Sequence, residues 1–158
     1  MTTDGPIHVR TATADDLDTL VRFNVAMAEE TEDRRLDEDV VRRGVARALA
    51  DARLGRYYLA EREGEVVGQL LVTTEFSDWR AGVFWWIQSV YVAPTARQAG
   101  IYRALHAHVT QLARQTPEVC GLRLYVDTHN TRAQQVYRTL GMQRTQYELY
   151  ETDWSGER

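Results

Sequence analysis

The feature that most constrains the fold is the stretch SVYVAPTARQAGIYRAL, residues 89–105, in which an apolar, strand-like segment runs through a short polar loop into a helix-like segment. The run GVFWWIQSVYV that leads into the loop has few polar interruptions, as expected of a central strand covered on both faces. Apolar residues recur at helical spacing over 101–115, and another strand-like segment follows at 121–127. This length of chain suffices for a βαβ crossover. It predicts two parallel strands, with the loop 93–100 at the carboxyl end of strand 83–92.

The loop 93–100 has the features of an anion site. Open α/β sheets bind ligands at the carboxyl ends of their strands, and a helix start carries unpaired N–H groups and a partial positive charge. The loop has no acidic side chain to cap the helix, Gly100 permits close approach of the backbone, and Arg97 adds a charge that suits a phosphate. The sequence therefore predicts a phosphate cradle, with an ordinary strand-to-helix turn as the alternative.

Two commoner phosphate motifs are absent from the sequence. The chain has no lysine and so no GxxxxGK[ST], and no GxGxxG follows a strand. The cradle therefore belongs to another class of phosphate site.

The remainder of the chain predicts one α/β domain. We expect a strand at 7–12, a helix that begins with Thr13 and Asp16 as a capping box, and a second helix between Asp37 and Gly55. RYYLAE and VVGQLLVTT predict an antiparallel hairpin, TRAQQVYRTLG a short helix closed by its glycine, and MQRTQYELYE a last strand. No linker or repeat divides the 158 residues, so we expect a single domain over 1–158 with its core at about 7–151.

Composition narrows the classes of partner and compartment. A formal net charge of −4 argues against nucleic acid or an anionic membrane as the main partner, since both need a concentrated basic face. Cys120 is the only cysteine, so there is no CxxC site, and we expect it to be a small buried residue. The N-terminal MTTDGPIHVR lacks the charged and apolar regions of a signal peptide, and no apolar run approaches the length of a membrane span. The expected location is the cytoplasm.

Two motifs resemble the GNAT superfamily of N-acetyltransferases. VYVAPTARQAGIYRAL resembles its acetyl-coenzyme A motif, in which a V-x-V-x-P strand end leads into an [RQ]-x-x-G-x-[GA] loop; Arg97 and Gly100 match, while Tyr102 stands where glycine or alanine is usual. NTRAQQVYRTLGM resembles its N-x-x-A-x-x-x-Y-x-x-x-G-[FM] motif, with Asn130 and Tyr137 in register. The order of elements over residues 7 to 150 agrees with that fold. The resemblance implies an α/β fold with a mixed, mostly antiparallel sheet, a splayed parallel strand pair and about four flanking helices.

The resemblance implies acetyl transfer from acetyl-coenzyme A to a primary amine, expected to be a small molecule, with no metal. The residues that it assigns to the cofactor are Val90, Tyr91, Val92, Arg97, Gln98, Ala99, Gly100, Ile101, Tyr102, Asn130 and Tyr137. Tyr137 would also protonate the departing thiolate. Asn130 as a helix N-cap and Tyr137 as a core aromatic are the structural alternatives. A non-catalytic acyl-coenzyme A binding module, or transfer to a protein amine, is the alternative function.

The acceptor side is less well defined by the sequence. The family often has a glutamate on the central strand, but Gln88 stands there and cannot act as a base, so Glu75 or water is the candidate base. The candidate acceptor-binding residues are Glu30 and Glu32, within the acidic stretch MAEETEDRR, together with Trp79 and Trp85. Solvated charges and core tryptophans are the alternatives. Trp85 and Trp86 should face opposite ways, and the tryptophan-rich strand at the end of a small sheet predicts a homodimer.

Overall fold

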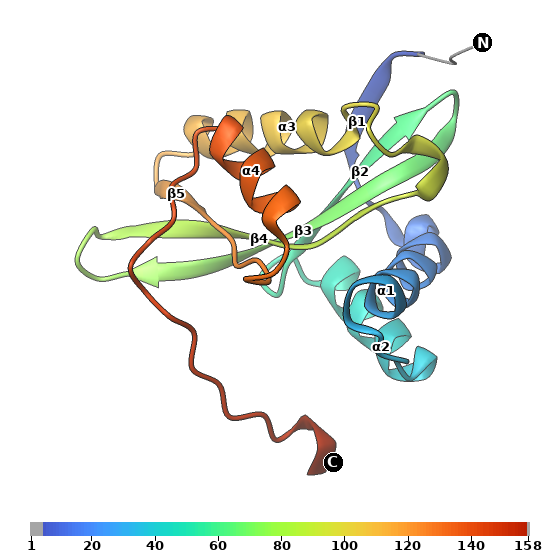
Figure 1. The fold of residues 1–158 in the computed structure, drawn as a ribbon, viewed down its shortest axis with the longest axis horizontal. Coiled ribbons are helices and arrows are strands. Elements are labelled where there is room, and N and C mark those ends of the chain that lie inside the picture. The colour runs from blue at the N-terminus through green and yellow to red at the C-terminus, as the bar shows by residue number, and fades with distance from the viewer. Residues whose placement is uncertain (1–4, 158) are drawn as a thin grey trace. The chain divides into compact units, whose positions relative to one another are not determined.

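The structure, a computed structural model, describes residues 5–157 and contains five strands and four α-helices in that range (Figure 1). In chain order these are β1 (Ile7–Thr11), α1 (Leu17–Glu32), α2 (Glu38–Ala50), β2 (Arg56–Arg62), β3 (Glu65–Ser77), β4 (Gly82–Val92), α3 (Ile101–Gln115), β5 (Val119–Arg123) and α4 (Thr131–Thr139). Short 3-10 turns precede α1 (Ala14–Asp16) and α3 (Pro94–Ala96) and lie near the end of the chain (Ser155–Glu157). Residues up to Tyr125 form one compact unit, and residues from Val126 on form a second, smaller one.

The sheet has the strand order β1-β2-β3-β4-β5. The pairs β1/β2, β2/β3 and β3/β4 are antiparallel, and β5 is parallel to β4. The parallel pairing extends only from Val83 opposite Val119 to Trp86 opposite Arg123, while β4 continues to Val92 without β5 beside it. The expected mixed sheet with a splayed parallel pair and four helices is therefore confirmed.

Helices cover both faces of this sheet (Figure 1). On one face α3 packs over a buried cluster that comprises Tyr58, Ala60, Val67, Leu70, Val72, Ile87, Ala96, Ile101, Leu105 and Val109. On the other face α1 and α2 pack over a second cluster, which comprises Leu20, Val21, Val45, Tyr57 and Leu59. The α3 helix has the bounds that the spacing of its apolar residues predicts.

The starts of the first two helices follow the sequence signals. The backbone N–H of Thr13 donates to Asp16 Oδ2 at 2.7 Å, so the predicted capping box is present. At α2 the carboxylate of Asp37 accepts hydrogen bonds from the N–H groups of Asp39 and Val40. At the start of each helix that covers the second face, an aspartate carboxylate accepts hydrogen bonds from nearby backbone N–H groups.

The second unit consists of α4 and the segment after it. Asn130 Oδ1 accepts a hydrogen bond from Ala133 N at 3.1 Å, so Asn130 is the N-cap of α4. The helix ends at Thr139 and is closed by Gly141, whose φ of 88° lies in the left-handed region, with Met142 N donating to Tyr137 O at 3.0 Å. The prediction of a short helix closed by Gly141 is confirmed.

Three predictions from the sequence need correction. The strand expected at 121–127 is β5, which begins two residues earlier and ends at Arg123. The closing strand expected in MQRTQYELYE is wrong, because residues 142–151 belong to no strand within the described part of the chain. A strand needs a partner for its backbone groups, and the exposed Tyr147, Leu149 and Tyr150 show that neither face of the segment is buried. Cys120, expected to be buried, is exposed on β5.

The expected homodimer stays a prediction. The turn between β3 and β4 carries Trp79, which is 87% exposed, and Phe76 on β3 is also exposed. Burial of such side chains between two copies would stabilise a dimer. Sedimentation velocity at tens of micromolar is expected to show a dimer, and a single monomeric species there would contradict the prediction.

Gly68 on β3 allows the start of α3 to lie close to the sheet. A Cβ at this position would lie 2.6 Å from Ile101 Cγ2 and 3.4 Å from the backbone oxygen of Tyr91. We therefore expect Gly68→Ala to lower the free energy of unfolding by about 1–3 kcal/mol through overpacking. Gly44→Ala on the exposed side of α2, where a Cβ meets nothing within 4 Å among the described residues, should raise it by about 1 kcal/mol. Urea unfolding of the two variants tests the difference in sign, and equal midpoints would contradict this account of Gly68.

Candidate functional site

The loop before α3 presents an open helix start. Gly100 is the N-cap residue, with a φ of 79° in the left-handed region, and it offers no side chain to cap the helix. The first helical hydrogen bond runs from Ala104 N to Gly100 O at 3.0 Å, so the N–H groups before Ala104 lie ahead of the helical ladder. Apart from Gly100 itself and its two neighbours in the chain, no described atom lies within 4 Å of the position that a Cβ on Gly100 would take, and the first turn has no acidic residue. The start of α3 thus keeps its partial positive charge and faces open space.

A β-bulge in β4 determines which side chains reach this region. Gln69 pairs with Tyr91 and Leu71 with Gln88, so β4 contains one residue more than β3 between these pairs. Ser89, inside the bulge, has a φ of 51°, and its carbonyl accepts a hydrogen bond from Gln69 Nε2 at 2.9 Å. The extra residue shifts the alternation of side chains along β4 by one position.

The shift is visible in the packing on the two faces of the sheet. Before the bulge, Trp85 and Ile87 belong to the cluster under α3, and after it Val90 and Val92 take that face. Tyr91 turns to the other face, where its ring lies 5.1 Å from that of Phe23 on α1. Without the extra residue Tyr91 would point toward α3.

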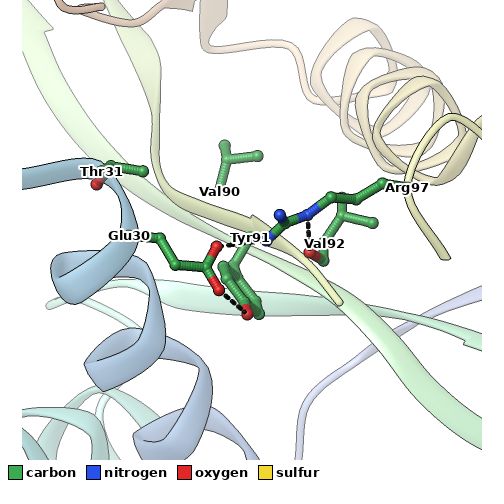
Figure 2. Close-up of a pocket in the computed structure, with 6 residues that line it drawn as sticks. All are labelled: Glu30, Thr31, Val90, Tyr91, Val92 and Arg97. Carbon is green, nitrogen blue, oxygen red and sulfur yellow. Dashed lines mark hydrogen bonds and ion pairs between the residues drawn. The ribbon is translucent and has the colours of Figure 1, made fainter. Parts of the chain in front are cut away.

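A pocket of about 480 Å³ lies beside the end of β4, and Figure 2 shows its lining: Glu30, Thr31, Val90, Tyr91, Val92 and Arg97. The side chain of Arg97 extends from the loop across β4 and donates from Nε to the carbonyl oxygen of Val92 at 3.1 Å. Its Nη2 makes a short ion pair with Glu30 Oε2 on α1. Tyr91 donates its hydroxyl proton to the other carboxylate oxygen, Glu30 Oε1, at 3.0 Å.

The charges in this pocket compensate one another. The hydrogen bond from Arg97 is the main reason that the pKa of Glu30 lies below its usual value. Burial, followed by the nearby Glu30 carboxylate, raises the pKa of Tyr91. At neutral pH the group is therefore a carboxylate held by a guanidinium and a neutral phenol.

Most of the predicted cofactor residues of the first unit lie together. Val90, Tyr91, Val92 and Arg97 line the pocket, and residues 98–102 form the loop end and first turn of α3. Tyr102, which replaces the usual small residue, lies sideways: it packs against the cluster under α3, with its ring 5.8 Å from that of His106. It therefore leaves the helix start open.

The predicted acceptor residues are not gathered in one place. Glu30 lies in the pocket, and Glu32 is exposed at the end of α1. Trp79 lies in the exposed turn after β3, and Trp85 packs on the α3 face of the sheet, opposite the face that Glu30 and α1 cover. Of these four residues only Glu30 lines the pocket.

Glu75 also lies away from the pocket. It pairs with Phe84 in the ladder, and Phe84 precedes Tyr91 by on the order of 20 Å along β4. Its Oε1 accepts a hydrogen bond from Arg123 Nη1 at 2.5 Å, and the Arg123 guanidinium lies 3.7 Å from the centre of the Phe84 ring. A general base at Glu75 stays a prediction, and the structure gives this carboxylate a structural partner.

In the second unit, Asn130 caps α4, as the structural alternative predicts. Tyr137 lies on the same helix, and burial raises the pKa of its phenol above the ordinary value, which keeps the proton on at neutral pH. The roles of both residues toward a cofactor stay predictions.

The sequence does not predict two features of the site, the bulge in β4 and the contact of Glu30 with Arg97. The bulge has a weak signal, since the polar pair Gln88-Ser89 interrupts an otherwise apolar strand. The contact of Glu30 with Arg97 has no local signal, because the two residues lie far apart in the chain. The sequence predicts that Glu30 binds the acceptor and Arg97 the cofactor, whereas the structure joins the two side chains in one ion pair.

Within residues 5–157, no helix combines the length and the apolar character that crossing a membrane requires. The same residues contain no group of three or more histidine, cysteine, aspartate or glutamate side chains placed to hold a metal ion.

Comparison with known proteins identifies the class to which this fold and site belong. The model of the acetyltransferase (GNAT) family matches residues 20–142. The chain therefore belongs to the GNAT family of acetyltransferases. No curated protein matches it.

Solved structures of the same fold agree with this assignment. A possible acetyltransferase from Clostridium difficile 630 is 41% identical, with a TM-score of 0.87 over 93% of this chain and 97% of that one. A probable acetyltransferase is 25% identical, with a TM-score of 0.81 over 94% and 98%. A predicted acetyltransferase from Clostridium acetobutylicum, solved with acetyl-CoA, is 18% identical, with a TM-score of 0.75 over 93% of this chain and 96% of that one, and this similarity shows the fold alone.

The left-handed conformation of Ser89 predicts an unusual order of stabilities. Glycine adopts this conformation without strain, whereas a β-branched residue is disfavoured there. We expect Ser89→Gly to raise the free energy of unfolding by about 1 kcal/mol and Ser89→Val to lower it by about 2 kcal/mol. Denaturant unfolding measures both. A regular strand at this position would give the reverse order, since valine favours strands and glycine weakens them.

Proposed function

We propose that this acetyltransferase transfers the acetyl group of acetyl-coenzyme A to a primary amine of a small molecule. The observation that carries the proposal is the uncapped start of α3, which opens beside a pocket along the unpaired end of β4 in a member of the GNAT family. The acetyltransferase from Clostridium acetobutylicum, which has the same fold, was solved with acetyl-CoA.

The residues present fit this cofactor. The start of α3, which has no side-chain cap, and the space beside Gly100 suit a diphosphate, because a helix start favours anions. β5 pairs with β4 only as far as Trp86, so the backbone of Val90 is available to an extended arm, and the carbonyl of Val92 becomes available when Arg97 leaves it. When bound, acetyl-coenzyme A supplies an activated acetyl thioester.

The chain's own residues would then transfer protons and orient the bound cofactor. The attacking amine must be neutral, and its proton goes to water or to Glu75 as the new C–N bond forms. Tyr137 gives its phenolic proton to the sulfur as the C–S bond breaks, and the proton on Tyr137 at neutral pH suits this role. Asn130 is proposed to contact the pantetheine arm.

A cationic small molecule is the acceptor that the pocket favours. Glu30 places a carboxylate in the pocket lining, and Glu32 lies on the same helix. Negative charge near an open site raises the local concentration of an ammonium substrate. Transfer to a protein amine is the second candidate, and a non-catalytic acyl-coenzyme A binding module is the third.

Thiol release from acetyl-coenzyme A over a panel of amines separates these functions. The panel should contain diamines, aminosugars and amino acids, together with peptides that have free N-termini. Rapid release with a small cationic amine is the expected result. Release only with peptides would favour the protein acceptor, and cofactor binding without release would favour the binding module.

Tyr137→Phe tests the proposed general acid. The substitution keeps the ring and removes the proton, so the single-turnover rate with the best amine of the panel should fall by a factor of roughly 10² to 10⁴, with little change in cofactor affinity. Tyr147→Phe is the matched control, because it removes a hydroxyl from an exposed tyrosine of the same unit. A Tyr137→Phe protein that reacts as fast as this control would return Tyr137 to a purely structural role.

A further inference from the structure

Arg97 is engaged by the protein itself at the place where a cofactor is expected. Its Nη2 pairs with Glu30 Oε2, and its Nε bonds to the carbonyl of Val92. Ala93 N donates to Val67 O on β3 at 2.8 Å, so the carbonyl of Val92 points to the other edge of β4, where no strand of residues 5–157 pairs with it. The Arg97 side chain therefore lies across the free edge of β4 (Figure 2).

Glu30 thus gives Arg97 an anionic partner from within the chain. We propose that the Glu30 carboxylate competes with the phosphates of the cofactor for Arg97, and that the oxygen released on cofactor binding becomes the contact for the cationic acceptor. The second half of this inference rests on the proposed function. It makes Glu30 a specificity-determining residue whose availability depends on the cofactor.

The exposure of the pair allows such an exchange. The side chains of Arg97 and Glu30 are 46% and 38% exposed, and ion pairs at this level of exposure are weak and readily replaced. A diphosphate carries more negative charge than one carboxylate, and it would also gain the N–H groups of the helix start. Both differences favour transfer of Arg97 from Glu30 to the cofactor.

Tyr91 keeps the released carboxylate in position. It bonds to Glu30 Oε1, whereas Arg97 bonds to Oε2, so loss of Arg97 frees one oxygen and leaves the other held. The ring of Tyr91 is buried and packs on Phe23, which fixes the hydroxyl. An ammonium group could then replace the guanidinium at Oε2 without an unpaired charge on either side.

This arrangement predicts opposite effects of one substitution on the two substrates. Glu30→Gln removes the competing charge and should tighten coenzyme A binding, by roughly two- to fivefold on the scale of an exposed ion pair. The same change removes the charge that the amine needs, so the KM of the acceptor should rise. Because bound cofactor would release Glu30 Oε2, it should raise the affinity for the amine. Since such coupling is reciprocal, a bound amine should raise the affinity for the cofactor by the same factor.

Calorimetric titration of coenzyme A into the wild type, Glu30→Gln, Arg97→Ala and the double variant tests the competition. Arg97→Ala should weaken binding by roughly five- to thirtyfold, and Glu30→Gln should have no further effect in its background. Glu29→Gln, which makes the same change of charge at the neighbouring position, is the control. A gain equal to that of Glu29→Gln, or one that persists without Arg97, would overturn the competition.

The acceptor arm uses the amine with the highest rate of thiol release in the panel. Glu30→Gln is expected to raise its KM while coenzyme A binds more tightly, and an unchanged KM would overturn the acceptor contact. Absence of turnover with every amine would instead refute the proposed function, while the calorimetric comparison would still decide whether Glu30 competes for Arg97. Absence of coenzyme A binding in all variants would overturn both.

Discussion

The site depends on one extra residue in the central strand. The bulge at Ser89 reverses the alternation of side chains in β4, so that Val90 and Val92 stay on the α3 face while Tyr91 turns toward α1. That reversal brings the Tyr91 hydroxyl to Glu30 and thereby links α1 to the strand that leads into the cradle. Gln69, buried on β3, holds the bulged backbone through the Ser89 carbonyl. The bulge therefore determines which elements contribute to the pocket.

The electrostatics of the pocket follow from a helix start with no acidic cap. The first turn of α3 has no acidic side chain, and Arg97 in the loop before it is neutralised by the carboxylate of Glu30 on α1. The two positively charged features of the site, the helix start and Arg97, therefore differ in whether the chain supplies an anionic partner. The helix start has no internal anionic partner among the described residues, whereas Arg97 is paired with Glu30, and we propose that a stronger anion displaces this partner.

Sequence alone predicts the parts of the fold that depend on local pattern. The spacing of Ile101, Leu105 and Val109 predicts α3 with its observed bounds, while the phosphate cradle in the loop before it stays a prediction. The sequence does not predict the features that depend on contacts between distant segments of the chain. The alternation of MQRTQYELYE suggests a strand, but a strand forms only where a neighbour pairs with it. The Ser89 bulge and the Glu30 to Arg97 contact arise from packing between distant segments, which no local propensity encodes.

Gly68 affects both the packing of the core and the position of the proposed ligand site. The first turn of α3 rests on the backbone of β3 because Gly68 has no side chain, and Ile101 fills that space. A larger residue at this position would push the first turn of α3 away from the sheet. A substitution that the core could absorb by moving α3 would therefore also displace the helix start that is proposed to bind the phosphates.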